Sequence, residues 1–398
     1  MLLYNVILTA FLLIIYSYQL VFLLKGEKGR SNPAKASPKR IAVLIPAKDE
    51  EEIIEESVRS VLESDYDGSR LSVFVLADNC SDRTGDVAKR AGATVFYRSS
   101  EKRGKGYALE YLIRRVGKTG RFDGYLVLDA DNTVEKDFIS KISDSLSEGY
   151  SVAVGARIPA RFGESAVGAL SGMCFLYESV YLNRGRFALG TMPFVLGTGF
   201  AFTHSFLEEM GGWRFFSLTE DFEMCAYMAL HGVRVRYTDS AVFYDPQPLC
   251  LRDSRSQRLR WTRGGGDVMR MYFARLISSL LKRPSLPVFD ILFSFTPAFL
   301  FAVALILGAA VGTALTASGS LASGELLLSL AIPILTVYIA LLLFAAYVLH
   351  TEGRICNAGF LKKALYTLLF PLFIFSFFPI AVLAVLKKRV GWRKIRRR

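Results

Sequence analysis

The middle of this chain alternates between short apolar runs and amphipathic segments. The apolar runs are rich in β-branched and aromatic residues, which is typical of buried strands, and the segments between them repeat apolar residues at helical spacing. Strands are predicted over residues 41–46, 71–77, 95–97, 125–128 and 151–156, and helices over residues 49–62, 105–116, 136–147, 165–184 and 220–231. This alternation predicts an α/β domain over residues 41–268, with a mostly parallel sheet, helices on both of its faces, and ligands at the carboxyl ends of the strands.

The start of the chain has a different pattern. Residues 1–24 contain no charged side chain and would span about 36 Å as a helix, so we expect an uncleaved transmembrane anchor. Residues 25–40 form a basic linker in which six Lys and Arg residues face a single Glu. Basic residues collect on the cytoplasmic side of membrane helices, so the domain that follows is expected to lie in the cytoplasm. The whole protein is expected to be a multi-pass protein of the cell membrane.

The last third of the chain returns to an apolar pattern. Residues 269–283 combine apolar and basic positions at helical spacing, which predicts an amphipathic helix in the membrane interface, ended by Pro284. Three apolar segments follow within a membrane region of residues 284–387, at 288–315, 326–349 and 364–386. A full span of the last segment would place the basic tail of residues 388–398 outside the cell, whereas a broken or re-entrant segment would keep it inside. The sequence leaves both topologies open.

Composition narrows the class of protein. The chain has 398 residues, 52% of them hydrophobic, and a formal net charge of +13. Because the basic residues crowd beside the apolar segments, anionic lipid headgroups explain the charge and no nucleic acid is needed. Five cysteines and three histidines lack the spacing of a metal cluster or a disulfide framework, so the cysteines are expected to be reduced.

The predicted strand at residues 125–128 leads into Asp129 and Asp131. On an extended backbone these two side chains would point to the same side, just beyond the carboxyl end of the strand. Paired carboxylates are hard oxygen ligands that suit Mg²⁺ or Mn²⁺ and a substrate diphosphate. The alternative is an ordinary polar turn after a buried strand.

Two other predicted strands also end in acidic residues. Asp49 follows the first strand and Asp78 the second, so the sequence predicts a pocket where they meet Asp129 and Asp131. Lys105 lies in the turn Arg103-Gly104-Lys105-Gly106 at the start of a helix, where it can meet phosphate oxygens. The spacing fits neither a Walker motif nor the dinucleotide fingerprint, and this stretch alone favours a flexible basic turn.

Together these stretches resemble a known family. Ile45 to Glu50, Asp78 to Thr84, Arg103 to Gly106 and Asp129 to Asp131 are similar to successive motifs of family 2 glycosyltransferases with the GT-A fold. Within that family the resemblance is to the membrane-embedded, processive synthases of hyaluronan, chitin oligomers, cellulose and bacterial capsules. It covers roughly residues 41–265.

The resemblance implies roles for particular residues. Asp221, in Thr219-Glu220-Asp221, matches the general base, although capping of helix 220–231 alone would explain Thr219 and Glu220. Asp129 and Asp131 would hold the metal. A nucleotide sugar, expected to be linked to UDP, would be held by Asp49, Asp78, Lys105, Asp129 and Arg260, with Glu50 or Glu51 as alternatives to Asp49. Gln257-Arg258-Leu259-Arg260-Trp261 matches the Q-x-x-R-W motif, which in a helix places Gln257, Arg260 and Trp261 on one face, with Gln257 and Trp261 toward the acceptor.

The expected function is thus an inverting transferase that builds a β-linked polysaccharide at the cytoplasmic face of the membrane. The enzymatic alternative is a transferase that adds one sugar to a lipid such as diacylglycerol or ceramide. A transporter with a nucleotide-sensing domain would need no base, and the presence of Asp221 and the Gln257–Trp261 motif disfavours it. The partners of the expected transferase would be a polysaccharide or lipid acceptor and the bilayer, and an oligomer is compatible with the sequence.

Overall fold

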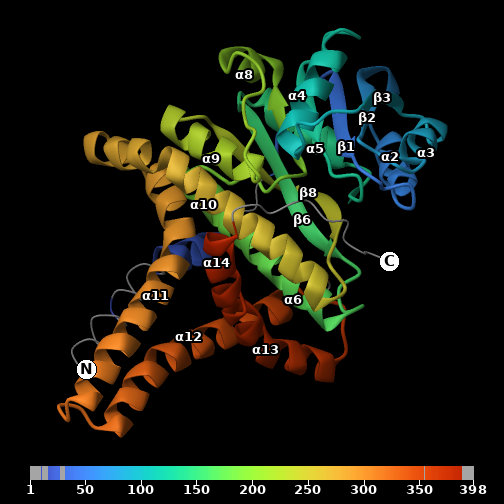
Figure 1. Ribbon diagram of the computed structural model, residues 1–398. Helices are drawn as coiled ribbons and strands as arrows, with labels where there is room; N and C mark the ends of the chain where they lie inside the picture. The colour runs from blue at the N-terminus through green and yellow to red at the C-terminus, as the bar shows by residue number, and fades with distance from the viewer. Residues whose placement is uncertain (1–9, 11–16, 27–31, 354, 388–398) are drawn as a thin grey trace.

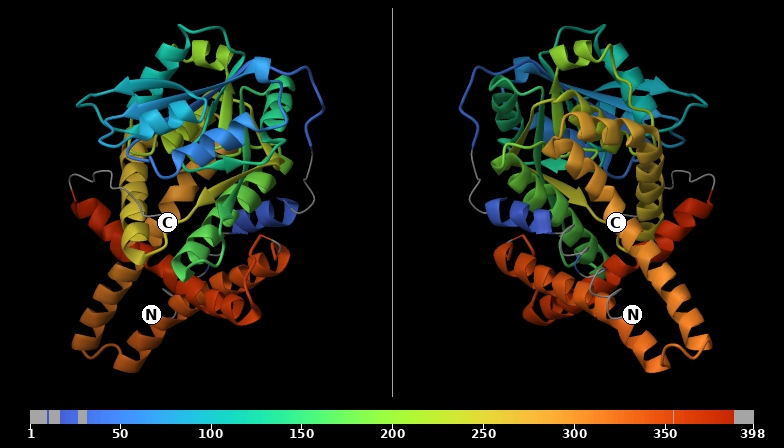
Figure 2. Two further views of the ribbon diagram at one scale, coloured as in Figure 1. Left: turned by 90° about the vertical axis from the view of Figure 1, so that its right-hand side faces the viewer. Right: turned by 90° about the vertical axis from the view of Figure 1, so that its left-hand side faces the viewer.

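The computed structural model describes residues 10, 17–26, 32–353 and 355–387, apart from the side chains of residues 295–305. An α/β domain lies at one end of the molecule and a group of long helices at the other (Figure 1). Helices α11 (Leu286–Ala317) and α12 (Ser323–Thr351) form a hairpin that projects away from that domain (Figure 2). Of the predicted N-terminal anchor, residues 10 and 17–24 are described and helical; the basic tail of residues 388–398 lies outside the described residues.

The strands of the described chain form one sheet in the order β3-β2-β1-β4-β7-β6-β8-β5. Neighbours β1 and β2, β2 and β3, β1 and β4, and β6 and β8 are parallel, whereas β7 is antiparallel to β4 and β6 and β5 is antiparallel to β8. The predicted α/β class is confirmed, with a sheet that is mixed because of β5 and β7. The strands are β1 (Ile41–Ala47), β2 (Leu71–Asp78), β3 (Thr94–Arg98), β4 (Gly124–Val127), β5 (Thr133–Val134), β6 (Val152–Ala160), β7 (Phe200–Thr203) and β8 (Val235–Pro246).

Helices cover both faces of this sheet because alternate side chains of each strand point to opposite faces. In β1, Ala42 and Leu44 join the hydrophobic cluster that includes α4 and α9, whereas Ile41, Val43 and Ile45 join the cluster that includes α2 and α5. The helices of the domain are α2 (Ile54–Leu62), α3 (Thr84–Arg90), α4 (Lys105–Val116), α5 (Phe138–Ser147), α8 (His204–Glu209) and α9 (Glu220–His231), with a short 3₁₀ turn at Gly68–Arg70. Helix α2 begins later than predicted, after a turn that contains Asp49 with φ at 56°.

The long helix predicted over residues 165–184 consists of three consecutive segments. It runs as α6 (Ala166–Phe175), a π-helical stretch η2 (Leu176–Leu182) and α7 (Asn183–Ala188). Ser165 caps its start by accepting a hydrogen bond from the backbone N–H of Gly168 at 2.9 Å. Stretches of π-helix are uncommon and are found mostly at functional positions.

The Q-x-x-R-W motif and the predicted interface helix belong to one continuous helix, α10 (Leu251–Lys282). The segment 269–283 is therefore the second half of the helix that carries the motif, rather than a separate element. Glycines 264–266 do not interrupt this helix. A Cβ atom at Gly264 would lie 2.6 Å from the Thr219 side chain, so glycine allows α10 to approach Thr219 closely.

Among the described residues, two helical segments are long and apolar enough to cross a membrane, Ser323–Thr351 and Phe360–Leu386. The second is divided at Ser376 into α13 (Phe360–Phe375) and α14 (Phe377–Leu386). Helix α14 lies beside α10 in Figure 1, and hydrogen bonds described below join the two.

Candidate active site

The carboxyl ends of β1, β2 and β4 meet at one edge of the sheet, as the sequence predicts. Strand β4 ends at Val127, and Asp129 and Asp131 lie in the turn that follows it. The backbone N–H of Asn132 closes this turn on the carbonyl of Asp129 at 3.1 Å. The expectation of an extended backbone across the two aspartates is therefore wrong: a turn, rather than the alternation of a strand, places both at the edge.

Lys105 lies among the carboxylates of this edge. Its ammonium group pairs with Asp129, donates a hydrogen bond to the carbonyl of Gly197 at 2.7 Å, and lies 4.0 Å from the carboxylate of Glu220. Burial disfavours the charged form of Lys105, but the negative charges of Asp129 and Glu220 outweigh it, so the pKa of Lys105 is raised above its ordinary value. The side chain remains a cation.

Helix α9 supplies two further carboxylates, Glu220 and Asp221, at its first turn. Burial and the charge of Asp221 raise the pKa of Glu220 to about 8, against the effect of Lys105. Burial also raises the pKa of Asp221, although its Oδ1 accepts a hydrogen bond from the backbone N–H of Phe222 at 2.8 Å. We call Asp129, Asp131, Glu220 and Asp221 the acidic cluster. The pKa of Glu220 is thus raised by burial and by a neighbouring carboxylate, whereas that of Asp221 is raised by burial alone.

Thr219 does not cap α9 as the sequence predicts. Its side chain makes no capping hydrogen bond, and its hydroxyl oxygen is buried without a hydrogen-bond partner. The reason is the approach of α10, because Gly264 packs directly against the Thr219 side chain.

A loop over residues 194–199 closes the site opposite Asp221. Gly197 has φ at 84°, and a Cβ atom at this position would lie 3.1 Å from Oδ2 of Asp221, so glycine keeps the space in front of that carboxylate open. Thr198 donates a hydrogen bond to Asn132 and accepts one from the backbone N–H of Asp129 at 2.9 Å. The loop and the turn with the two aspartates are thus fixed to each other.

The carboxylates of the acidic cluster are ligands of the kind that a divalent cation takes. They offer hard carboxylate oxygens in excess of the nearby Lys105 charge, and the glycine at 197 leaves room beside them. Asp129 and Asp131 are the two that lie in the strand-end turn.

A second set of residues supports this site and escaped the sequence analysis. Arg157 of β6 donates hydrogen bonds to Asp245 of β8 at 2.8 Å and to the carbonyl of Leu196 at 3.2 Å. Asp245 also accepts a hydrogen bond from Asn132 at 2.8 Å. The signal in the sequence was one arginine inside an otherwise apolar strand, since a buried charge requires a partner.

Trp261 of the Q-x-x-R-W motif is linked to Arg157 of the site by contacts with the ring of Phe175. The rings of Trp261 and Phe175 are packed edge-to-face, with 5.4 Å between their centroids, and the Arg157 guanidinium lies 3.7 Å from the centroid of Phe175. Gln257 is buried and Arg260 is partly exposed. The structure therefore brings Trp261 to the wall that contains Arg157, and among the described residues no hydrogen bond or ion pair joins Arg260 to the acidic cluster.

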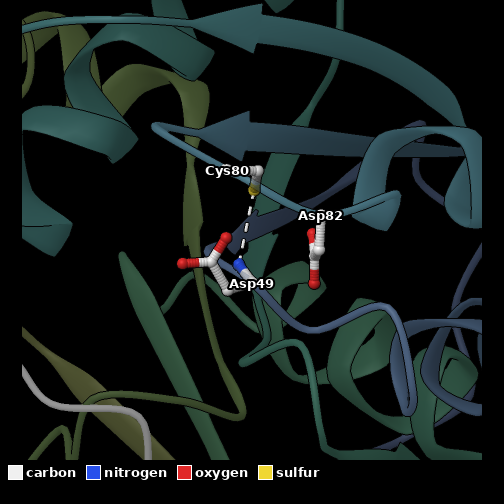
Figure 3. Close-up of side chains that lie close together, drawn as sticks. All are labelled: Asp49, Cys80 and Asp82. Carbon is white, nitrogen blue, oxygen red and sulfur yellow. Dashed lines mark hydrogen bonds between the residues drawn. The ribbon is translucent and has the colours of Figure 1, made fainter.

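Asp49 and Asp78 lie at the neighbouring strand ends. Figure 3 shows Asp49 beside Cys80 and Asp82, with ligand atoms that lie within 4.8 Å of one another. Asp49 accepts hydrogen bonds from the backbone N–H and the hydroxyl of Ser81 at 2.6 and 3.1 Å, and its own N–H donates to the sulfur of Cys80.

Asp82 accepts hydrogen bonds from the backbone N–H groups of Glu51 and Thr84, at 3.1 and 3.0 Å. These bonds tie the loops after β1 and β2 together, and a thiol among carboxylates is a mismatched ligand set for Mg²⁺ or Mn²⁺. Asp78 forms an ion pair with Arg98 at 2.6 Å. Contact of Asp49 and Asp78 with a nucleotide stays a prediction.

Comparison with known proteins is consistent with this geometry. The sequence model of the family described as "Glycosyltransferase like family 2" matches residues 38–264. The chain is 29% identical over 294 residues to "Probable glycosyltransferase YdaM" of Bacillus subtilis, a match that covers 71% of this chain and 68% of that protein. It is 24% identical over 257 residues to the poly-β-1,6-N-acetyl-D-glucosamine synthase of Staphylococcus aureus, which covers 64% of this chain and 60% of the synthase.

A solved structure shares the fold. The mannosyltransferase PcManGT of Pyrobaculum calidifontis, in complex with GDP-Man and Mn²⁺, superimposes with a TM-score of 0.61 at 17% identity, covering 97% of this chain and 99% of that one. The predicted GT-A fold is thereby confirmed. Since the family model covers more than half of the chain, this protein belongs to the family 2 glycosyltransferases and is an enzyme that transfers sugar.

Proposed function

We propose that this enzyme is a metal-dependent, inverting glycosyltransferase that extends a β-linked polysaccharide from a nucleotide sugar, with UDP as the nucleotide. The observation that carries the proposal is the acidic cluster, in which Asp221 faces the open space at Gly197 and Lys105 lies between Asp129 and Glu220. The resemblance to a poly-N-acetylglucosamine synthase supports a polymer as the product.

Asp221 is the general base of this mechanism. It accepts the proton of the acceptor hydroxyl while that oxygen forms a bond to the anomeric carbon, and the bond from that carbon to the diphosphate breaks with its electrons on the phosphate oxygen. A raised pKa suits this role, because a carboxylate is a stronger base as its pKa approaches the working pH. Attack from the side opposite the leaving group inverts the anomeric centre.

Asp129 and Asp131 would hold Mg²⁺ or Mn²⁺, which supplies charge stabilisation for the departing diphosphate when bound. Lys105 supplies a further positive charge at the same place, since its ammonium already lies against Asp129 and the carbonyl of Gly197. Asp78 at the end of β2 is assigned to the nucleotide base, and Asp49 to the nucleotide more generally.

The acceptor side of the site is assigned to Gln257 and Trp261. Trp261 is partly exposed and packs edge-to-face against Phe175, so one surface of the Trp261 ring is assigned to the apolar face of a sugar. Arg260, on the same helix, is assigned to the diphosphate, and the partial exposure of its side chain leaves it free to move toward the donor.

We further propose that the catalytic domain lies in the cytoplasm and that the C-terminal tail stays on the same side. The support is a pair of arginines of α10. Arg258 donates hydrogen bonds to the carbonyl of Phe373 and the hydroxyl of Ser376 at the break between α13 and α14, at 3.3 and 2.6 Å. Arg263 donates to the carbonyls of Ala384 and Lys387 at 3.2 Å each.

These four acceptors include backbone groups that the ends of α13 and α14 leave unpaired, and such groups would be costly in lipid. A re-entrant segment broken at Ser376 would leave the start and the end of this segment on the cytoplasmic side. A thiol-reactive, membrane-impermeant reagent applied to intact cells should therefore fail to label a cysteine added at the C-terminus. Labelling of that cysteine without permeabilisation would show a full span instead.

The reaction itself is tested by incubating the purified protein with radiolabelled nucleotide sugars in the presence of Mn²⁺. We expect one donor to give a labelled polymer that migrates as a ladder on a gel. A product of a single sugar on lipid would replace the polysaccharide assignment with the lipid alternative, and the absence of transfer from every UDP-linked donor would contradict the assignment of UDP.

A further inference from the structure

Arg186 and Asp290 form an ion pair in which both side chains have no exposed surface, with Nε of Arg186 at 2.7 Å from Oδ2 of Asp290. Arg186 belongs to α7 of the catalytic domain, and Asp290 belongs to α11 of the helical hairpin. Tyr18, in the N-terminal helix, donates a hydrogen bond to the same carboxylate at 3.2 Å. Three elements that are distant in sequence thus meet at one carboxylate.

The N-terminal helix and α7 meet at glycines. A Cβ atom on Gly185 would lie 2.1 Å from the carbonyl oxygen of Phe22, and one on Gly26 would lie 3.1 Å from the backbone nitrogen of Gly185. Residue 185 precedes Arg186 directly, so this close approach fixes the backbone that carries the arginine.

From Arg186 the contacts continue into the active-site loop. Its Nη1 donates to Oδ1 of Asn183 at 3.1 Å, and its guanidinium lies 3.7 Å from the centroid of the Phe194 ring. Asn183 binds both backbone groups of Phe194: Oδ1 accepts from the N–H and Nδ2 donates to the carbonyl, each at 2.8 Å. The side-chain amide of Asn183 therefore pairs with both backbone groups of Phe194, as the backbone of a neighbouring β-strand would.

Each following residue of the loop is also held, and the contacts end at the acidic cluster. Val195 binds the thiol of Cys225, the carbonyl of Leu196 accepts from Arg157, the carbonyl of Gly197 accepts from Lys105, and Thr198 donates to Asn132. A shift of Phe194 would consequently move Gly197 relative to Asp221 and Lys105.

We propose that Arg186 and Asp290 are positioning residues through which α11 sets the geometry of the 194–198 loop, so that the transferase site is complete only when α11 is docked on α7. This proposal rests on the proposed function for its effect on rate. The proposal also predicts how well ordered the 194–198 loop is, and this is measured without substrate. A buried ion pair is weak support for stability in general, and its removal on one side leaves the other charge buried and uncompensated.

The chain offers a matched control two residues away. Arg184 of the same helix pairs with Asp239 of β8 at 2.6 Å, with side chains that are 7% and 16% exposed. This pair joins α7 to the catalytic domain itself and leaves the contact of Asn183 with Phe194 untouched. Asp239→Asn therefore reports what the loss of a buried ion pair on α7 does by itself.

The experiment compares Asp290→Asn, Arg186→Lys and Asp239→Asn in the full-length protein, reconstituted in lipid nanodiscs. Hydrogen exchange in the peptide that covers residues 194–198 is measured without substrate, and kcat and donor KM are measured separately. We expect Asp290→Asn to accelerate exchange in this peptide and to lower kcat about 10²-fold, since a misplaced catalytic geometry has a cost of that order, with a small change in donor KM. Arg186→Lys keeps the charge, so its loop exchange and its kcat should lie between those of Asp290→Asn and the wild type. Asp239→Asn should leave loop exchange as in the wild type.

Wild-type exchange at residues 194–198 in Asp290→Asn, or equal acceleration in Asp239→Asn, would overturn the proposal. If Asp290→Asn fails to fold, Asn183→Leu tests the same connection, because it removes both hydrogen bonds to Phe194 and leaves the Arg186–Asp290 pair in place; a loop that stays protected in this variant also overturns it. A wild type that transfers no sugar would refute the proposed function, whereas the exchange comparison would still decide the role of Asp290.

Discussion

Two groups of acidic residues lie at the same edge of the sheet, and they differ in their surroundings. In the loops after β1 and β2, the carboxylates of Asp49 and Asp82 accept hydrogen bonds from backbone N–H groups and hydroxyls of adjacent turns. In the acidic cluster, Glu220 is buried and Asp221 is partly buried, and both have raised pKa values. Carboxylates in backbone hydrogen bonds fix loops, whereas buried carboxylates with raised pKa can take up a proton.

The largest expected effect concerns Asp221. Asp221→Asn keeps the shape of the side chain and removes the base, so kcat should fall about 10²–10⁴-fold. The nucleotide is assigned to other residues, and donor affinity should change little. Calorimetric titration of donor and a transfer assay on the same preparation check both parts, and near wild-type transfer would remove Asp221 from the mechanism.

Asp131→Asn should weaken the metal site. Substitutions that only support metal ligands lower affinity by about 10–100-fold, and loss of a ligand should cost at least as much. We expect Mn²⁺ binding measured by calorimetry to weaken by that factor, and turnover to be nearly abolished. Unchanged Mn²⁺ and nucleotide binding in this variant would place the metal elsewhere.

The raised pKa of Glu220 predicts a pH dependence of the stability of the fold. Glu220 has a pKa of about 8, so the folded state holds a proton that the unfolded chain loses near 4.5. The unfolding free energy should therefore fall as pH rises between these two values. Glu220→Gln should flatten this part of a plot of chemical-denaturation stability against pH, and an unaltered slope would show that Glu220 is ionised in the fold.

Trp261→Ala should have a smaller effect, on the acceptor alone. Stacking on an aromatic ring contributes on the order of 1 kcal/mol, which is about fivefold in affinity. We expect shorter products, or donor hydrolysis only, at nearly unchanged nucleotide affinity. Electrophoresis of labelled product measures chain length, and full-length polymer from this variant would exclude the stacking role.

The sequence predicts much of the fold because local patterns determine it. Helices α4 and α9 begin at the predicted residues, and the β1, β2 and β4 strands end where polar residues begin. Contacts between distant elements are not visible in such patterns. Thr219 resembles a helix cap, yet packing against Gly264 of α10 decides its environment.

The supporting residues of the site were missed for the same reason. Arg157, Asn132 and Asp245 come from β6, the turn after β4 and β8, and only the sheet order brings them together. The contacts of the last apolar segment with α10 likewise depend on Arg258 and Arg263, whose positions on α10 carry no signal of their partners in α13 and α14.

The central claim, that the two acidic groups have different tasks, is tested most directly by a parallel rate measurement. Transfer of labelled sugar is followed at saturating donor for the wild type, Asp221→Asn and Asp82→Asn. Asp82 accepts from backbone N–H groups and has no part in the proposed mechanism, so its replacement should lower thermal stability and leave kcat close to that of the wild type. The account predicts that the loss of transfer is confined to Asp221→Asn; equal losses of kcat in both variants would contradict it.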